Sequence, residues 1–422
     1  MNRLRFISAI LCVFALLCPA REARALDMAG LEAQVRDLAN TVRELQTTVA
    51  GQAHEIESLR RTVPAVEGPA ATAPASRSLQ GKWNPDIGVV ADVVATLDTP
   101  KSDAEGADRV AVREVELVFG SNVDPYSRLD ATLSISDFEE MAVEEAYLTR
   151  YGLPLGFTGR FGRFKPRIGK AVGMHRDSLD TVDEPLVIQR YFGVEGMSKT
   201  GADIVRGIDL PWPVTHEVTL GVLEGASGEG GTAFGTARRM PTLYAHLKNY
   251  LDLDDTTGLE FGQTFVTGSK DDDEQFETNI AGLDAALIHQ YGSLQHVKLQ
   301  SEAFYMSRED SFVDVMDDTT GDLRRIEFDG TLWGLYVLAD WRFDPQWAAG
   351  YRHDYVELVD FMPVEGIQGF DDGDSVYLTF YQSEFARWRA QYTHNNLAAG
   401  EDEHRILLQG TFAIGEHKHK LQ

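Results

Sequence analysis

Hydrophobic and polar residues alternate along most of the chain with a period of two. In the segment 87–98, Ile, Val, Ala and Leu at odd positions alternate with mostly polar even positions, and 333–343 repeats the pattern with Trp333 and Trp341 on its apolar face. Segments of about ten residues with one apolar and one mostly polar face are typical of strands that separate lipid from water. The pattern predicts an all-β fold, a closed antiparallel transmembrane β-barrel of about 16 strands. The expected strands cover 86–98, 110–121, 127–136, 141–150, 157–167, 199–207, 215–224, 241–250, 257–267, 278–289, 296–306, 331–343, 346–357, 374–382, 384–395 and 403–414.

The connections between these strands differ with the parity of the strand that they follow. Connections after even-numbered strands are short, such as Asn122–Pro125 and Asp344-Pro345, whereas those after odd-numbered strands are mostly long and polar, such as 168–198 and 307–330. Outer-membrane barrels carry short turns at one end and long loops at the other. A soluble β-sandwich has no reason to sort its loops in this way, so the alternation favours a barrel.

A seven-residue repeat precedes the barrel region. Its two apolar positions are occupied by Val35, Val42, Val49, Ile56 and Val63, and by Leu31, Leu38, Leu45, Gln52 and Leu59. A stripe this narrow predicts an α-helical coiled coil over 26–63, rather than one amphipathic helix packed on its own domain, and therefore a homo-oligomer. The helix alone leaves dimer and trimer open. We expect the Ala- and Pro-rich stretch 64–82 to be a linker and 83–422 to form the barrel.

The first 25 residues have the features of a signal peptide. Arg3 and Arg5 precede the apolar run Phe6–Ala20, and Ala23-Arg24-Ala25 supplies a small-x-small cleavage pattern. Both cysteines lie within this segment, so the exported chain is expected to have neither disulfides nor thiolate metal sites.

The composition excludes one class of partner. The full chain of 422 residues has a net charge of -27, and the leader contributes four Arg and one Glu to it. A surface this acidic repels phosphates, so no nucleic acid is expected to bind. The acidic segments, among them Asp271–Glu274, are expected to be solvated external loops, with divalent cations that bridge lipopolysaccharide phosphates as the alternative.

The order of the segments resembles a known group of proteins. A coiled coil, an Ala/Pro linker and about 16 strands resemble trimeric porins of the phosphate-selective O/P type and the dicarboxylate porins. The segments Glu114–Asp130, Val143–Leu148 and Gly162–Gly169 are similar to the corresponding sequences in a family of uncharacterised proteobacterial outer-membrane proteins. The resemblance implies a trimer and passive diffusion. One departure is that Phe412 is followed by ten more residues, whereas such barrels usually end on an aromatic residue.

Charged residues gather in and just before the third long connection, Ile168–Ser198. In porins of this build, this loop folds inward and narrows the channel. Cations at period two cannot face lipid without a cost of about 2–4 kcal/mol each, so we expect them to point into the lumen. The expected constriction consists of Arg163, Lys165, Arg167, Lys170, Arg176, Asp177, Asp180, Asp183, Glu184 and Arg190. The expected lumen wall includes Glu114, Glu116, Arg352, Arg387 and Arg389. These charges either select solutes across a narrow pore or pin the loop to the wall, and the two roles are compatible.

The expected function is a porin in the bacterial outer membrane, with the coiled coil in the periplasm. Its expected partners are copies of itself, outer-membrane lipids and lipopolysaccharide, and small polar solutes, anions among them. Two alternatives stay open: an uptake receptor without a plug domain, for a scarce ligand such as a metal, and a barrel that tethers the envelope. No enzyme signature, cofactor motif or catalytic residue stands out, and His417-x-His419 alone does not define a metal site.

Overall fold

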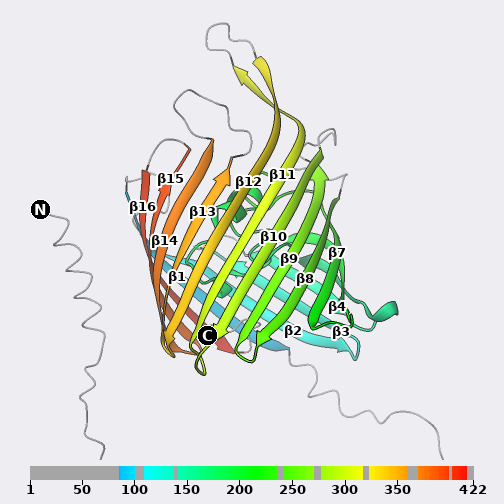
Figure 1. Ribbon diagram of the computed structural model, residues 1–422, viewed down its shortest axis with the longest axis vertical. Coiled ribbons are helices and arrows are strands. Elements are labelled where there is room, and N and C mark those ends of the chain that lie inside the picture. The colour runs from blue at the N-terminus through cyan, green and yellow to red at the C-terminus, as the bar shows by residue number, and fades with distance from the viewer. Residues whose placement is uncertain are drawn as a thin grey trace, which may run out of the picture. The chain divides into compact units, whose positions relative to one another are not determined.

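Sixteen antiparallel strands in the described part of the chain form a closed barrel (Figure 1). The computed structural model describes residues 85–99, 109–136, 141–235, 241–269, 277–316, 323–358, 369–398 and 402–415. The expected signal peptide, coiled coil and linker lie outside the described residues, as do Asp271–Glu274, His417 and His419. Among the described residues, no helix has the length and hydropathy needed to cross a membrane.

The strand bounds lie close to those expected from the alternation. They are β1 (Asp86–Thr99), β2 (Val110–Asp124), β3 (Ser127–Ile135), β4 (Ala142–Arg150), β5 (Thr158–Phe164), β6 (Lys199–Ile208), β7 (Val214–Leu223), β8 (Thr242–Asp254), β9 (Thr257–Ser269), β10 (Glu277–Gln290), β11 (His296–Met316), β12 (Leu323–Asp344), β13 (Trp347–Glu357), β14 (Phe370–Ser383), β15 (Ala386–Asn396) and β16 (Asp402–Gly415). Each strand pairs with its neighbours in sequence, and β1 pairs with β16 from Gly88 opposite Gly415 to Thr99 opposite His404. A closed sheet leaves no unpaired edge, which a lipid environment requires. The predicted fold is confirmed.

The prediction of a loop over 307–330 is wrong, because most of this stretch is paired strand. The stretch 307–330 extends the hairpin of β11 and β12, whose pairing continues from Arg308 opposite Gly330 to Met316 opposite Leu323. Figure 1 shows this hairpin, in yellow, rising beyond its neighbours. Where the hairpin rises beyond its neighbours, its two strands pair only with each other. That part needs no alternation of lipid-facing and inward residues, so the alternation pattern could not predict it.

Alternating side chains give the wall two faces. On β12, Trp333 and Trp341 are 43% and 54% exposed on the outside, whereas Tyr336 and Asp340 between them are 1% and 4% exposed on the inside. Large apolar side chains repeat this outward exposure around the barrel, for example Leu283 on β10 and Trp388 on β15. An apolar outer belt of this kind suits a lipid surrounding.

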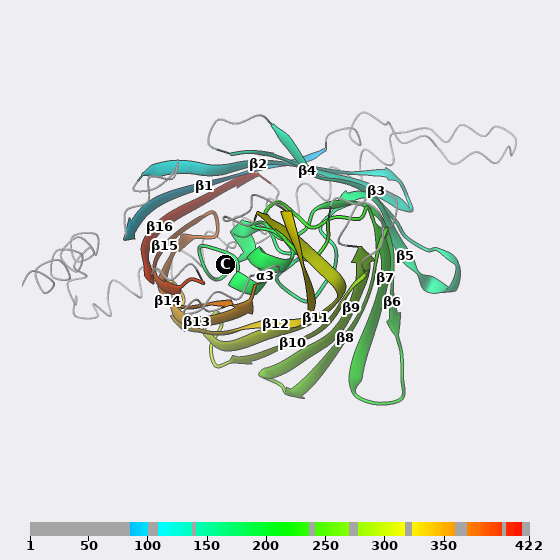
Figure 2. The ribbon, with the colours of Figure 1, turned by 90° about the horizontal axis from the view of Figure 1, so that it is seen from above.

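The segment between β5 and β6, residues 165–198, folds into the barrel (Figure 2). This inner loop carries the short helix α3 (Leu186–Tyr191), which contacts β12, β13 and β14. Val187, Ile188 and Tyr191 of the helix are fully buried in an apolar core that the wall completes. Its wall members are Leu223, Tyr244, Val266, Ile280, Phe304, Met306, Tyr336, Leu338 and Val356. The inner face is therefore polar in part only, because the loop covers an apolar sector.

Candidate functional site

The chain leaves the wall at the end of β5. Phe164 is buried inside the barrel and Phe161 is 70% exposed on the outside, so the inward and outward faces alternate up to that point. Gly162 has a φ of 134°, and a Cβ there would lie 2.2 Å from the carbonyl oxygen of Ala146. Only glycine allows this backbone to pass so close to β4. β5 ends two residues later, at Phe164, and the following residues turn inward.

This turn corrects the predicted basic face. Arg163 shares the outward face of Phe161, is more than a third exposed, and lies 3.8 Å from Glu224 beyond the end of β7. Lys165 is buried inside, 3.0 Å from a carboxylate oxygen of Glu144. The prediction that Arg163, Lys165 and Arg167 share one lumenal face is wrong, because the period of two stops with β5.

Arg167 and Lys170 border a cavity of about 810 Å³, which we call the vestibule. Its lining reaches from the inner loop to the β8–β9 turn at the short-turn end. Lys170 and Lys248 both pair with Glu260, the second at 2.9 Å. Among the described residues, Nη1 of Arg167 has no hydrogen-bond partner. The loop side of the vestibule therefore presents cations.

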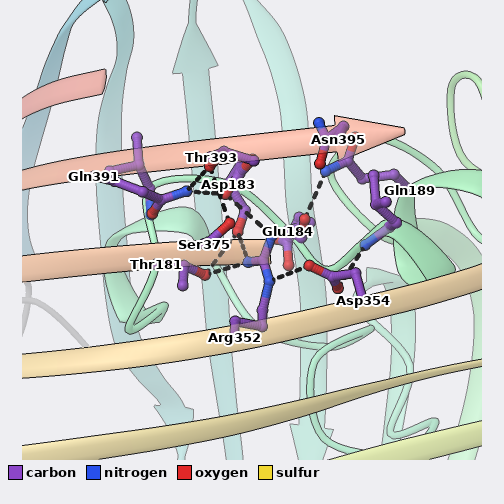
Figure 3. A network of polar contacts seen from close by, with 12 residues as sticks. Thr181, Asp183, Glu184, Gln189, Arg352, Asp354, Ser375, Gln391, Thr393 and Asn395 are labelled. Carbon is purple, nitrogen blue, oxygen red and sulfur yellow. Dashed lines mark hydrogen bonds and ion pairs between the residues drawn. The ribbon is translucent and has the colours of Figure 1, made fainter. Parts of the chain in front are cut away.

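Residues 177–183, in the middle of the inner loop, are bound to the wall by three arginines, of which Figure 3 shows Arg352. Arg352 of β13 donates to the Thr181 hydroxyl at 2.5 Å and the Asp183 carbonyl at 2.7 Å, and pairs with Asp354 at 2.6 Å. Arg389 donates to the carbonyl oxygens of Thr181 and Leu179, at 2.7 Å and 2.9 Å.

Arg387 donates to the carbonyl oxygen of Asp177 at 2.8 Å. All three predicted wall arginines thus face inward, where they hold the backbone of the loop.

Further ion pairs tie the remaining predicted residues to the wall or to the loop itself. Asp180 pairs with Lys298 of β11, and Arg176 pairs with Glu195 at 2.9 Å. Arg190 at the end of α3 pairs with Asp371 of β14 at 2.6 Å. The structure therefore brings most of the predicted set together inside the barrel, mainly as anchors of the loop.

Glu184, unlike these residues, forms no ion pair or hydrogen bond through its carboxylate among the described residues. It is 2% exposed. Burial raises the pKa of Glu184 to about 7, although Lys165, Arg176 and Arg352 act in the opposite direction.

Glu302 of β11 is an anchor that the sequence did not single out as one. Its carboxylate accepts the backbone N–H of Lys170 at 2.8 Å, that of Ala171 at 2.7 Å, and the hydroxyl of Tyr336 at 2.7 Å. Gly169, with a φ of 57°, packs directly against it, and a Cβ there would lie 2.1 Å from Glu302 Oε2. A carboxylate in a strand gives no sign that it will meet a loop 132 residues away in sequence.

A cluster of buried carboxylates surrounds His175 of the inner loop. His175 Nδ1 lies 3.4 Å from Glu116 Oε1 and 3.3 Å from Glu144 Oε1, and Nε2 lies 3.2 Å from Glu145 Oε2. Burial and the neighbouring Lys165 oppose the charged imidazolium. Hydrogen bonds with the three carboxylates outweigh them and hold the pKa of His175 well above its usual value.

Two adjacent glutamates of a strand both face inward in this cluster. The register of β3 and β4 shifts there, from Thr132 opposite Glu145 to Leu133 opposite Val143, so that Glu144 has no partner residue across the ladder. A bulge of this kind breaks the alternation and re-aims a side chain. The period of two places Glu144 and Glu145 on opposite faces, which is why the sequence did not predict the cluster around Glu116.

Comparisons with known proteins bear on the fold. No family model matches the chain. An uncharacterized protein of Aquifex aeolicus (strain VF5) is 28% identical over 334 residues, 72% of this chain and 68% of that protein. The outer membrane channel DcaP of Acinetobacter baumannii has a similar structure, with a TM-score of 0.50 and 11% identity over 78% of this chain and 96% of that one. Pseudomonas putida OprB gives a TM-score of 0.53 and 9% identity over 80% and 95%. At these identities the likeness to the two structures establishes a shared fold.

Proposed function

We propose that this protein is an outer-membrane porin through which small polar solutes diffuse passively. The observation that carries the proposal is the closed wall with an apolar outer belt, a charged vestibule inside it and a loop folded across the interior. A closed barrel hides its backbone polar groups from lipid while its interior stays available to water and solutes. The likeness in fold to an outer membrane channel supports the proposal.

The vestibule favours anions where it meets the inner loop. Three cations, Arg167, Lys170 and Lys248, gather there with Glu260 and the buried Asp284 as the neighbouring carboxylates. Fixed charges in a water-filled constriction select solutes by charge. The acidic residues Asp252, Asp254 and Asp255 lie at the short-turn mouth, so any selectivity arises deeper, at the loop.

The proposal extends to the segments outside the described residues. A cleaved leader over 1–25 would export the chain, and the heptads of 26–63 would join copies of it, as a trimer in the periplasm, through the linker 64–82. The outward apolar belt would face outer-membrane lipid and lipopolysaccharide. Cross-linking of the full chain, with and without 31–63, measures the number of copies.

Ion selectivity in planar bilayers tests the function. Purified protein should give stepwise conductance, and its reversal potential in a salt gradient should show anion preference. Arg167→Gln and Lys170→Gln should shift that potential toward cations. Arg163→Gln is the matched control, since Arg163 lies four residues before Arg167 but on the outer face.

Two results would refute this. One is a lack of conductance from correctly folded protein. The other is a shift for Arg163→Gln as large as that for Lys170→Gln, which would place the selective charges elsewhere.

A further inference from the structure

The buried cluster around His175 has the spacing of metal ligands. Ligand atoms of Glu116, Glu144 and His175 all lie within 4.8 Å of one another. A tetrahedral ion with ligands at about 2.1 Å separates neighbouring ligand atoms by about 3.4 Å. The distances from His175 Nδ1 to the two glutamate oxygens, 3.4 Å and 3.3 Å, match that edge and are longer than a good hydrogen bond.

The other nitrogen of the ring is held as metal-binding histidines require. Nε2 lies 3.2 Å from Glu145 Oε2. Metal-ligating histidines usually donate their second N–H to a carboxylate, which fixes the tautomer and aims the lone pair at the ion. With Nε2–H donated to Glu145, an ion bound between Glu116 and Glu144 would displace the proton through which His175 Nδ1 otherwise contacts these two carboxylates.

An unsatisfied carboxylate oxygen forms a second, independent observation. Glu144 is 8% exposed, and its Oε2 has no hydrogen-bond partner among the described residues, although Oε1 pairs with Lys165. Buried polar atoms are nearly always satisfied, so this oxygen of Glu144 indicates a missing partner at the site.

The balance of charges in the cluster also favours a bound cation. Five carboxylates that are at most 8% exposed gather in this sector of the interior: Glu114, Glu116, Glu144, Glu145 and Glu184. Lys165 and Arg176 are the cations that act on them most directly, and Arg176 also pairs with Glu195. Arg352 is held by Asp354 and Asp183.

We propose that Glu116, Glu144 and His175 bind one divalent transition-metal ion, of the Zn²⁺ or Mn²⁺ kind, and that this ion fastens the inner loop to β2 and β4. One imidazole and two carboxylates suit such ions better than Ca²⁺ or Mg²⁺, which prefer oxygen alone. Glu145 is the positioning residue that orients the ring. The vestibule lining includes Glu145, Lys165 and His175, which gives the ion a route from solution. The proposal does not depend on what the barrel transports.

Calorimetric titration of the full exported chain tests the site. The protein is folded in detergent, treated with a chelator and titrated with Zn²⁺, Mn²⁺, Ca²⁺ and Mg²⁺. His417→Gln and His419→Gln are present in every sample, so that any zinc held by this His-x-His pair is not counted. We expect one Zn²⁺ or Mn²⁺ per chain, weaker Ca²⁺ and Mg²⁺ binding, and a higher unfolding temperature with the bound ion.

Variants assign the ligands. His175→Gln and Glu116→Gln should abolish the binding, and Glu145→Gln should weaken it about 10- to 100-fold. His353→Gln, on the outer face, is the control that leaves the binding unchanged. Lys165→Met removes a competing cation and should tighten binding by about tenfold or more, an effect that a purely structural lysine would not produce.

Three outcomes would overturn the site: no binding of Zn²⁺ or Mn²⁺ at millimolar concentration, binding that survives in His175→Gln, or stronger binding of Ca²⁺ or Mg²⁺ than of either. Heat-modifiable migration on a gel shows whether each variant has folded. If His175→Gln does not fold, the opposite changes expected for Lys165→Met and Glu145→Gln decide.

Discussion

Replacing Arg352 by methionine should release part of the inner loop and destabilise the barrel. The side chain of Arg352 is 1% exposed, pairs with Asp354 at 2.6 Å and Asp183 at 3.2 Å, and donates to Thr181 (Figure 3). Methionine fills similar space but leaves a fully buried carboxylate without its cation. Removal of one partner of a buried ion pair costs about 3–5 kcal/mol, and we expect Arg352→Met to lower the free energy of unfolding by that amount.

A second variant separates the lost pairing from lost packing. In Arg352→Met with Asp354→Asn, the orphaned charge is gone, and the amide oxygen can still accept the Leu186 N–H that Asp354 accepts at 3.1 Å. Gln391 continues to donate to Asp183 at 2.7 Å. The double variant should lose only about 1–2 kcal/mol, a typical value for the hydrogen bonds removed.

Two measurements follow these variants. Equilibrium unfolding in denaturant, observed by tryptophan fluorescence, gives the free energies. Limited trypsin digestion gives the state of the loop, since Arg176 and Arg190 become cleavable only when it leaves the wall. The view that Arg352 holds the loop would be refuted if Arg352→Met alone unfolded with the same midpoint and slope as the parent protein and resisted trypsin equally.

Two further predictions concern the same loop. Glu302→Leu should leave the backbone N–H groups of Lys170 and Ala171 buried without an acceptor, at a cost of about 1–3 kcal/mol each. Glu302→Gln keeps an acceptor and should lower the free energy of unfolding by less. Unfolding curves of both variants test this order. Glu184 has a pKa raised to about 7 in the folded protein, so folding favours its protonated form, and its contribution to stability is complete below pH 4 and is lost as the pH rises through 7. Glu184→Gln should therefore gain up to about 3 kcal/mol over the parent protein at pH 8 and little at pH 4, and an equal difference at both pH values would contradict the assignment.

The sequence predicted the wall better than its contents. The alternation along 333–343 reflects contact with lipid on one face of a strand. The parity of the connections reflects the direction in which each strand runs. Both patterns depend on single strands and their neighbours, so they can be recognised in the sequence. The inner arginines Arg352, Arg387 and Arg389 lie on inward faces for the same reason. The coiled coil over 26–63 stays a prediction.

The errors come from positions where the alternation stops. Arg163 follows the alternation of β5 onto the outer face, whereas Lys165 lies inside because β5 ends at Phe164. Glu144 faces inward because a bulge interrupts β4. Neither event leaves a mark in the pattern of polar and apolar residues. Glu302 and His175 acquire their roles through contacts across the interior, which depend on how a loop packs and not on any spacing in the chain.

The apolar core inside the barrel couples assembly of the wall to folding of its loop. Phe192 of the loop packs edge-on against Phe304 of β11, with ring centroids 5.1 Å apart, and Val187 lies against Gly334 and Val356. A partly assembled sheet would expose these apolar inward faces to water, and a loop left outside would expose its own. The nascent protein is therefore most vulnerable to aggregation before the pairing of β1 with β16 has formed.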